Sequence, residues 1–162
     1  MKSKTVLIKV LNSLLVDELT AIKRYTVQSE MCADWGYGKL HQEIKNQAMD
    51  EKTHAEWLIE RIIFFDGAPA VSGLNSIKVG KTVSEMICNN ENRKLDVVHS
   101  YNNAIKHVRE VYDQDTLELL TRILIMEEDH VDWAEKQGAQ IDQMGLENYL
   151  VHQTVSCANL FN

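Results

Sequence analysis

The sequence predicts an all-helical protein, a four-helix bundle with one long connection between its second and third helices. Three observations lead to this prediction. Seven Gly and one Pro in 162 residues leave little of the turn chemistry that a sheet fold needs. Four long stretches carry apolar residues at steps of three and four, the spacing of one face of a helix. Between the second and third stretches, roughly sixteen residues lack this pattern and can span about 50 Å when extended.

The first two predicted helices form an antiparallel hairpin. The first runs from about Thr5 to Asp34 and the second from about Lys39 to Phe65, and the residues 35–38, Trp-Gly-Tyr-Gly, make a tight turn between them. The core-facing positions are Leu11, Leu15, Glu18, Ile22 and Tyr25 in the first helix, and Leu40, Ile44, Glu51, His54, Leu58, Ile62 and Phe65 in the second.

The second half of the chain repeats this plan. Thr82-Val83-Ser84-Glu85 is a capping box that opens a third helix ending near Tyr112. Asp115 can cap a fourth helix that ends near Gly138. A short fifth helix at about 145–155 and a polar tail complete a single domain, 1–162, with the bundle at about 5–137. The core-facing positions are Val83, Ile87, Asn90, Lys94, Val97, Tyr101, Ala104, Val108 and Val111, then Leu120, Ile123, Leu124, Glu127, His130, Val131 and Ala134.

Composition excludes several classes of protein. A formal charge of −7 and a pI near 5.3 argue against nucleic acid or an anionic membrane as partner, and they are compatible with attracting cations. The three cysteines are odd in number and lack Cys-x-x-Cys spacing, which argues against a disulfide framework or a thiolate zinc site. There is no signal-like apolar segment and no stretch long enough to span a membrane. We therefore expect a cytoplasmic protein.

Two motifs carry the chemistry of the chain. Glu51-Lys52-Thr53-His54 and Glu127-Glu128-Asp129-His130 each place a carboxylate and an imidazole three residues apart, on one face of a helix. The position 33 residues before Glu51 is Glu18, a carboxylate inside an apolar pattern. The same step back from Glu127 reaches Lys94, so the second half breaks the repeat at one position.

The burial of these side chains implies a source of positive charge. Burying three carboxylates together costs several kcal/mol per ion unless cations compensate. A metal can supply that charge, and carboxylate and imidazole ligands without thiolate suit iron, manganese or zinc, as a single ion or as a pair bridged by Glu51 and Glu127. A purely ionic network in the core is the alternative.

At these residues the chain resembles the bacterioferritins, within the ferritin-like proteins, from residue 1 to about 150. The resemblance implies a ferritin-like bundle in a hollow 24-subunit shell. Such a shell oxidises ferrous iron at a di-iron centre within each subunit, stores ferric mineral, and binds heme b between paired subunits. The resemblance also implies that Glu18 and His54 are terminal ligands of one iron and that His130 is a terminal ligand of the other. Glu51 and Glu127 would then bridge the two irons. The resemblance rests on Glu18, Tyr25, Trp35-Gly36, residues 51–55 (Glu-Lys-Thr-His-Ala), 60–62 (Glu-Arg-Ile), 127–133 (Glu-Glu-Asp-His-Val-Asp-Trp) and 144–150 (Met-Gly-Leu-Glu-Asn-Tyr-Leu).

Lys94 differs from the family pattern at the position of a metal ligand. It stands where the family's second iron site has a terminal glutamate, and a protonated amine cannot ligate a cation. The three glutamates and Lys94 together carry a formal charge of −2, which one divalent ion neutralises. We therefore expect one or two non-heme irons per subunit, with a mononuclear or half-filled site and the ammonium in place of the second metal. A competing hypothesis is that Glu91, one turn earlier, swings inward to replace the missing ligand.

Lys52 differs from the family pattern at the position of a heme ligand. It occupies the position of the methionine that ligates heme iron, so heme b is not expected. Met49 and Met31 are nearby thioethers, but a methionine on a helix is more often packing than a ligand. Tyr25, two turns from Glu18, is a candidate for a redox role, although aromatic residues at this spacing are usually core.

Three functions fit these features. The leading hypothesis is an iron-storage shell subunit with a degenerate ferroxidase centre, in a homo-oligomer or in a hetero-oligomer with a sister subunit. The second is a di-metal oxidoreductase that scavenges peroxide or oxygen and does not store iron. The third is a structural shell subunit that co-assembles with an active sister.

Overall fold

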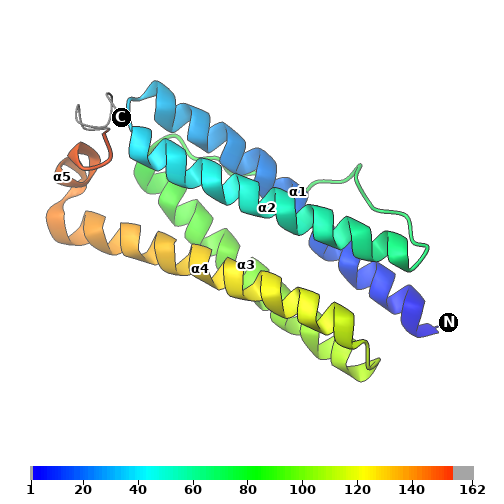
Figure 1. Ribbon diagram of the computed structural model, residues 1–162. Helices are drawn as coiled ribbons and strands as arrows, with labels where there is room; N and C mark the ends of the chain where they lie inside the picture. The colour runs from blue at the N-terminus through cyan, green and yellow to red at the C-terminus, as the bar shows by residue number, and fades with distance from the viewer. Residues whose placement is uncertain (1, 155–162) are drawn as a thin grey trace, which may run out of the picture.

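The predicted bundle is confirmed. The computed structural model describes residues 2–154. Its four long helices are α1 (Lys2–Asp34), α2 (Gly38–Phe64), α3 (Val83–Glu110) and α4 (Gln114–Met144), and a short α5 (Leu146–Val151) follows at one end of the bundle (Figure 1). α1 and α2 form one antiparallel hairpin, and α3 and α4 form the other. The end of the predicted fifth helix at residue 155 and the polar tail lie outside the described residues.

The connection between α2 and α3 runs back along α1, so that α3 starts at the same end of the bundle as α2 (Figure 1). Three polar side chains of α1, spaced eight residues apart, fasten it: Asn12, Thr20 and Gln28. We call these three residues the α1 ladder. Their hydrogen bonds satisfy backbone groups that the connection, which has no secondary structure, cannot pair internally. These bonds join Asn12 Nδ2 to Ala68 O (3.1 Å), Ala70 N to Asn12 Oδ1 (2.8 Å), Asn75 N to Thr20 Oγ1 (3.0 Å) and Gln28 Nε2 to Val79 O (2.7 Å).

The helix termini agree with the predicted caps in one case and differ in another. The Thr82 hydroxyl accepts a hydrogen bond from the backbone N–H of Glu85 at 3.2 Å, as the capping box predicts. The cap of α4 is Asp113 instead of Asp115, with Asp113 Oδ1 accepting from the backbone N–H of Thr116 at 2.8 Å. Two aspartates near the start of one helix compete for this role, and Asp113 also binds Arg61 at 2.8 Å. α4 continues six residues past the predicted end at Gly138, because an interior glycine costs a helix only about 1 kcal/mol.

The bundle core has two apolar halves. One half contains the amino-terminal part of α1 and the carboxyl-terminal part of α2, with Leu11, Leu15 and Leu58 fully buried. The other contains Tyr25 and Leu40, and it continues to α5 through Tyr149 and Cys32. The predicted core-facing positions of all four helices are buried, except Ile22, Val111, Leu124 and Val131, which are half-buried.

Two features of residues 2–154 bear on the class of protein that composition predicts: the state of the cysteines and the apolar character of the helices. Cys32 and Cys88 are free thiols in this part of the chain, and Cys157 lies outside the described residues. No helix among residues 2–154 combines the length and the apolar character needed to cross a membrane.

Candidate metal centre

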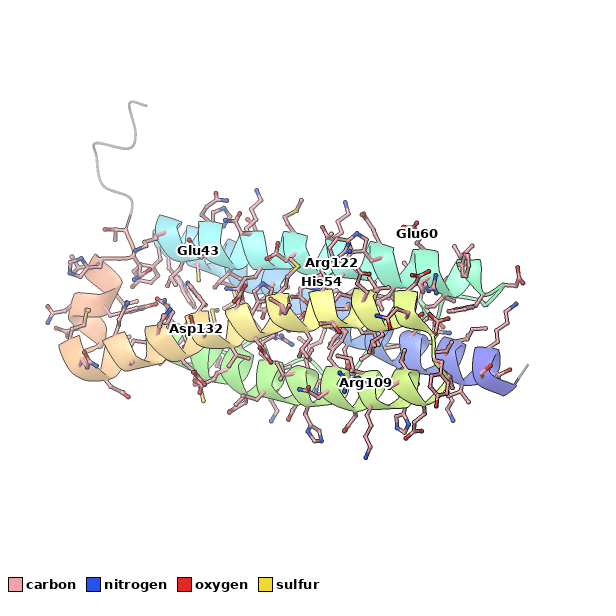
Figure 2. All side chains as sticks on the ribbon, turned by 60° about the horizontal axis from the view of Figure 1, so that its bottom comes forward. Glu43, His54, Glu60, Arg109, Arg122 and Asp132 are labelled. Atoms are coloured by element: carbon pink, nitrogen blue, oxygen red, sulfur yellow. The ribbon has the colours of Figure 1, made fainter. Side chains whose placement is uncertain are left out.

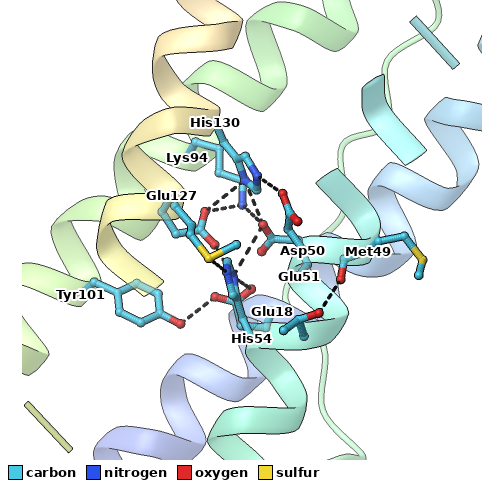
Figure 3. A network of polar contacts seen from close by, with 11 residues as sticks. Glu18, Met49, Asp50, Glu51, His54, Lys94, Tyr101, Glu127 and His130 are labelled. Atoms are coloured by element: carbon cyan, nitrogen blue, oxygen red, sulfur yellow. Dashed lines mark hydrogen bonds and ion pairs between the residues drawn. The ribbon is translucent and has the colours of Figure 1, made fainter. Parts of the chain in front are cut away.

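A layer of charged side chains separates the two apolar halves at mid-length of the bundle. His54 lies there between α2 and α4 (Figure 2), and Figure 3 shows the charged groups pointing toward one another from all four long helices. We call this layer the charged cluster. Its members are at most 6% exposed. They are Glu18 from α1, Glu51 and His54 from α2, Lys94 from α3, and Glu127 and His130 from α4.

Four of these residues form a group that could hold a metal ion. One ligand atom from each of Glu18, Glu51, His54 and Glu127 lies within 4.8 Å of the others. The Nδ1 atom of His54 faces the carboxylates, at 3.2 Å from Glu127 Oε1 and 3.5 Å from Glu18 Oε2. Glu18 Oε2 and Glu51 Oε2 are buried and have no hydrogen-bond partner among the described residues, whereas Glu51 Oε1 contacts Lys94 and His130. Buried oxygens without a donor are what a bound cation would satisfy, so these residues fit one ion.

Lys94 is buried inside the cluster, as its register predicts. Its Nζ atom lies 2.5 Å from Glu127 Oε2 and 2.9 Å from Glu51 Oε1. Burial alone would lower the pKa of Lys94, but the charges of Glu127 and Glu51 outweigh burial and hold that pKa well above its usual value. The charged ammonium therefore lies between the two carboxylates that would bridge a pair of ions.

The carboxylates differ in the direction of their pKa shifts. Burial and the negative charges of Glu51 and Glu127 hold the pKa of Glu18 well above its usual range. Burial alone would raise the pKa of Glu127 and of Glu51, but the Lys94 ammonium reverses this, and the pKa of Glu127 is well below its usual range. Lys94 thus supplies much of the charge that keeps the two bridging carboxylates ionised.

His130 belongs to the cluster but lies outside the four-residue group. Its Nδ1 is 3.0 Å from Glu51 Oε1, and its Nε2 is 3.0 Å from Asp50 Oδ2. Burial alone would lower the pKa of His130, but its contacts with the carboxylates of Asp50, Glu127 and Glu51 outweigh burial and raise that pKa to about 11. As an imidazolium, His130 joins Lys94 as a second cation, so two cations face two ionised glutamates when no metal is bound. The five predicted ligands are brought together, and their binding of metal stays a prediction.

Sequence reasoning missed three partners of this cluster. The Tyr101 hydroxyl donates to Glu18 Oε1 at 2.6 Å, and Met126 Sδ lies 3.2 Å from His54 Nε2. The third partner is Asp50, which pairs with His130. The available signal for Tyr101 was its place on the core-facing row, seven residues after Lys94. Tyr25 places its ring 5.3 Å from Lys94 Nζ, and its buried hydroxyl has no hydrogen-bond partner among the described residues.

Glu91 lies away from the cluster. Its Oε2 atom is 4.0 Å from the position that a Cβ would take at Gly138, and Gly138 is eleven residues along α4 from Glu127. At 1.5 Å per residue this is about 16 Å. The geometry therefore gives no support to Glu91 as the replacement ligand.

The residues relevant to heme lie on the surface of the first hairpin. Lys52 is exposed, Met49 is 56% exposed, and Met31 is half-buried. Lys23 and Lys45 are exposed on the same two helices. The expected absence of heme b stays a prediction.

Comparison with known proteins settles the family. The pattern of the ferritin family, described as a ferritin-like domain, matches residues 8–144, which is most of the chain. This chain belongs to the ferritin-like family. Among its ferritin-like relatives is a bacterial ferritin of Synechocystis sp., 39% identical over 154 residues, which cover 94% of this chain and 99% of the relative. A bacterial ferritin of Paramagnetospirillum magnetotacticum is 37% identical, with 93% of each chain covered. A bacterioferritin of Mycobacterium leprae is 34% identical, with 88% of this chain and 89% of the relative covered.

Proposed function

We propose that this chain is an iron-storage subunit of bacterioferritin type, which takes up ferrous iron at one intrasubunit site and stores ferric mineral in a cytoplasmic oligomeric shell. Relatives named bacterial ferritin and bacterioferritin match nearly the full length of the chain, and this supports storage over a function specific to the superfamily's small enzymes. Glu18, Glu51, His54 and Glu127 would hold the ferrous ion.

The proposal of a single ferrous site per subunit rests on the position of Lys94. The ammonium is in contact with Glu51 and Glu127, so a second cation would have to displace it or share both carboxylates with it. Coulomb repulsion between an ammonium and a divalent ion in a buried site disfavours that arrangement. Each subunit therefore binds one ferrous ion tightly.

The side chains of the charged cluster would bind the ferrous ion, which is the substrate, and balance its charge. A ferrous ion bound there supplies one electron when it is oxidised. Tyr101 fixes the orientation of Glu18 through its 2.6 Å hydrogen bond, and His54 presents Nδ1 to the carboxylates. Lys94 keeps Glu51 and Glu127 ionised and ready to bind a cation. Because one iron supplies one electron and dioxygen needs two to become peroxide, oxidation is slow compared with a centre that holds two irons.

A structural shell subunit is the second candidate. The cluster has two cations facing two ionised carboxylates without any metal, so the core does not need iron to neutralise its charge. Such a subunit would assemble with a sister subunit that carries a complete centre. This candidate predicts a large particle and no tight ferrous site in this chain. The peroxide- or oxygen-scavenging alternative predicts a small oligomer with at most two irons per subunit.

Anaerobic ferrous titration of the metal-free protein tests the proposal. We expect one tight site per subunit in the wild type and two in Lys94→Glu, which also oxidises ferrous iron faster when air is admitted. Lys106→Glu makes the same charge change at an exposed position of α3 and should leave the count at one. Two sites in the wild type would refute the role of Lys94, and no site would favour the structural subunit.

Particle size and iron loading test storage separately. We expect the assembled protein to be a large hollow particle that retains many irons per subunit after aerobic loading. A small oligomer that holds at most two irons would refute storage and favour the oxidoreductase.

A further inference from the structure

A polar cavity of about 280 Å³ lies between α1, α3 and the connection that precedes α3, and no residue of the charged cluster lines it. It offers room for a small ion with some of its hydration, because a water molecule occupies about 30 Å³ of liquid. Three cationic side chains line it, Arg24, Lys78 and Arg93, together with the polar side chains of Ser76, Asn89 and Asn92 and one carboxylate, Asp96.

Arg24 is the unusual member of this lining. It is 3% exposed, and its Nη2 atom is buried without a hydrogen-bond partner among the described residues. Its Nε donates to the side-chain oxygen of Asn90 at 3.1 Å, and its guanidinium lies 4.9 Å from the ring centre of Tyr25. Both of these partners are uncharged. A buried guanidinium normally has a carboxylate or another anion beside it, since an unpaired buried charge is costly.

A chain of hydrogen bonds holds Arg24 in this place. Asn90 accepts from Arg24 with its oxygen and donates from its nitrogen to Gln28 Oε1 at 2.8 Å. Gln28 in turn donates to the backbone oxygen of Val79 at 2.7 Å. The side chains of Arg24, Asn90 and Gln28 are at least 97% buried. The positive charge is therefore fixed in position, and a neutral amide occupies the place where a carboxylate could have neutralised it.

The rest of the lining leaves a net positive charge. Arg93 is paired with Asp17 at 3.2 Å and with Asp96 at 3.8 Å, so its charge is largely matched. Lys78 is exposed at the mouth of the cavity. Arg24 and Lys78 have no carboxylate partner within residues 2–154. This arrangement stands out on a chain of formal charge −7, which as a whole repels anions.

We propose that this cavity is a binding site for a small tetrahedral oxyanion of the inorganic phosphate type. The guanidinium of Arg24 presents a planar fork of N–H donors, which matches the oxygens of phosphate, and Lys78 contributes a point charge. Ser76, Asn89 and Asn92 can supply neutral donors to the remaining oxygens. The site does not depend on iron, because none of its residues belongs to the charged cluster.

Titration of the assembled, metal-free protein with inorganic phosphate tests this site by calorimetry and phosphorus NMR. Metal-free protein is needed so that phosphate cannot bind through iron. We expect one saturable site per subunit, with sulfate as a competitor. Arg24→Gln should weaken binding by at least about tenfold, the loss expected for a hydrogen bond to a charged group. Lys78→Gln, on the exposed connection, should weaken it by a smaller factor without affecting the fold.

Lys106→Gln is the matched control, because it removes one positive charge from an exposed position of α3 that does not line the cavity. Its affinity for phosphate should equal that of the wild type. Absence of saturable binding would overturn the proposal, and it is also the result expected if a carboxylate of a neighbouring subunit fills the cavity. Equal weakening by Lys106→Gln and Lys78→Gln would overturn it as well, because binding would then follow overall charge.

Discussion

Replacing Lys94 with methionine should strongly destabilise the metal-free protein. The substitution keeps an unbranched side chain of similar length but removes the ammonium from between Glu51 and Glu127. Both carboxylates and Lys94 are at most 1% exposed, so water cannot replace the lost charge. Breaking a buried ion pair by removing one partner costs about 3–5 kcal/mol. For a chain of this size, that loss lowers the melting temperature by roughly 6–20 °C.

The assay is thermal unfolding of metal-free protein at one fixed subunit concentration, with and without a divalent ion. Zinc or ferrous ion should raise the melting temperature of Lys94→Met more than that of the wild type, because the ion then supplies the missing charge. At about one hundred times the dissociation constant, binding to the folded state alone adds about 2.7 kcal/mol. Lys106→Met, at an exposed position, controls for the chemical change itself.

Two results would refute this reasoning. A metal-free Lys94→Met protein that melts with the wild type would mean that the ammonium does not hold the carboxylates together. Equal stabilisation of both proteins by the divalent ion would mean that the ammonium and the ion do not compete for the same oxygens.

Three further predictions concern other contacts. Tyr101→Phe removes the 2.6 Å hydrogen bond to Glu18 and should cost about 1–3 kcal/mol in urea unfolding, because a buried carboxyl oxygen loses its donor; an unchanged midpoint would contradict this. Asp113 caps α4 and binds Arg61, and its hydrogen bonds outweigh burial and lower its pKa in the folded state. The stability that its charge contributes is therefore complete above the unfolded-state pKa, near 3.8, and is lost as pH falls through the lower folded-state pKa. The difference in melting temperature between the wild type and Asp113→Asn should accordingly be present at neutral pH and vanish in strong acid, whereas a constant difference would exclude the charge as its cause. Protein expressed with a heme supply should show no Soret band, and Lys52→Met should gain one if the family's thioether ligand is the missing element; a stoichiometric band in the wild type would show that heme binds by another route.

The core-facing positions of each helix were predictable because a helix repeats every 3.6 residues, whatever its neighbours are. That period alone placed Glu18, Lys94 and Glu127 in the core, although all three are charged. It also predicted that one residue from each long helix meets at mid-length. The long connection then allowed the second hairpin to copy the first.

The contacts within the cluster were not predictable in the same way. Whether Lys94 contacts Glu51, Glu127 or both depends on rotations of the helices by a few degrees, and residue spacing does not encode them. The Tyr101 hydrogen bond depends on the length of its side chain across the core, from α3 to Glu18 on α1. The α4 cap was misplaced because Asp113 and Asp115 both precede the helix, and the pairing of Asp113 with Arg61 is a long-range contact.

The α1 ladder has a consequence for how the two hairpins find each other. The extended reach of the connection, about 50 Å, is also long enough to deliver α3 and α4 to a neighbouring copy of the chain. Hydrogen bonds from Asn12, Thr20 and Gln28 hold the connection along its own α1. We expect the ladder to disfavour hairpin exchange between subunits, because a connection that leaves its own α1 loses these hydrogen bonds. Chains that lose it would fold into the same helices but assemble partly as swapped dimers.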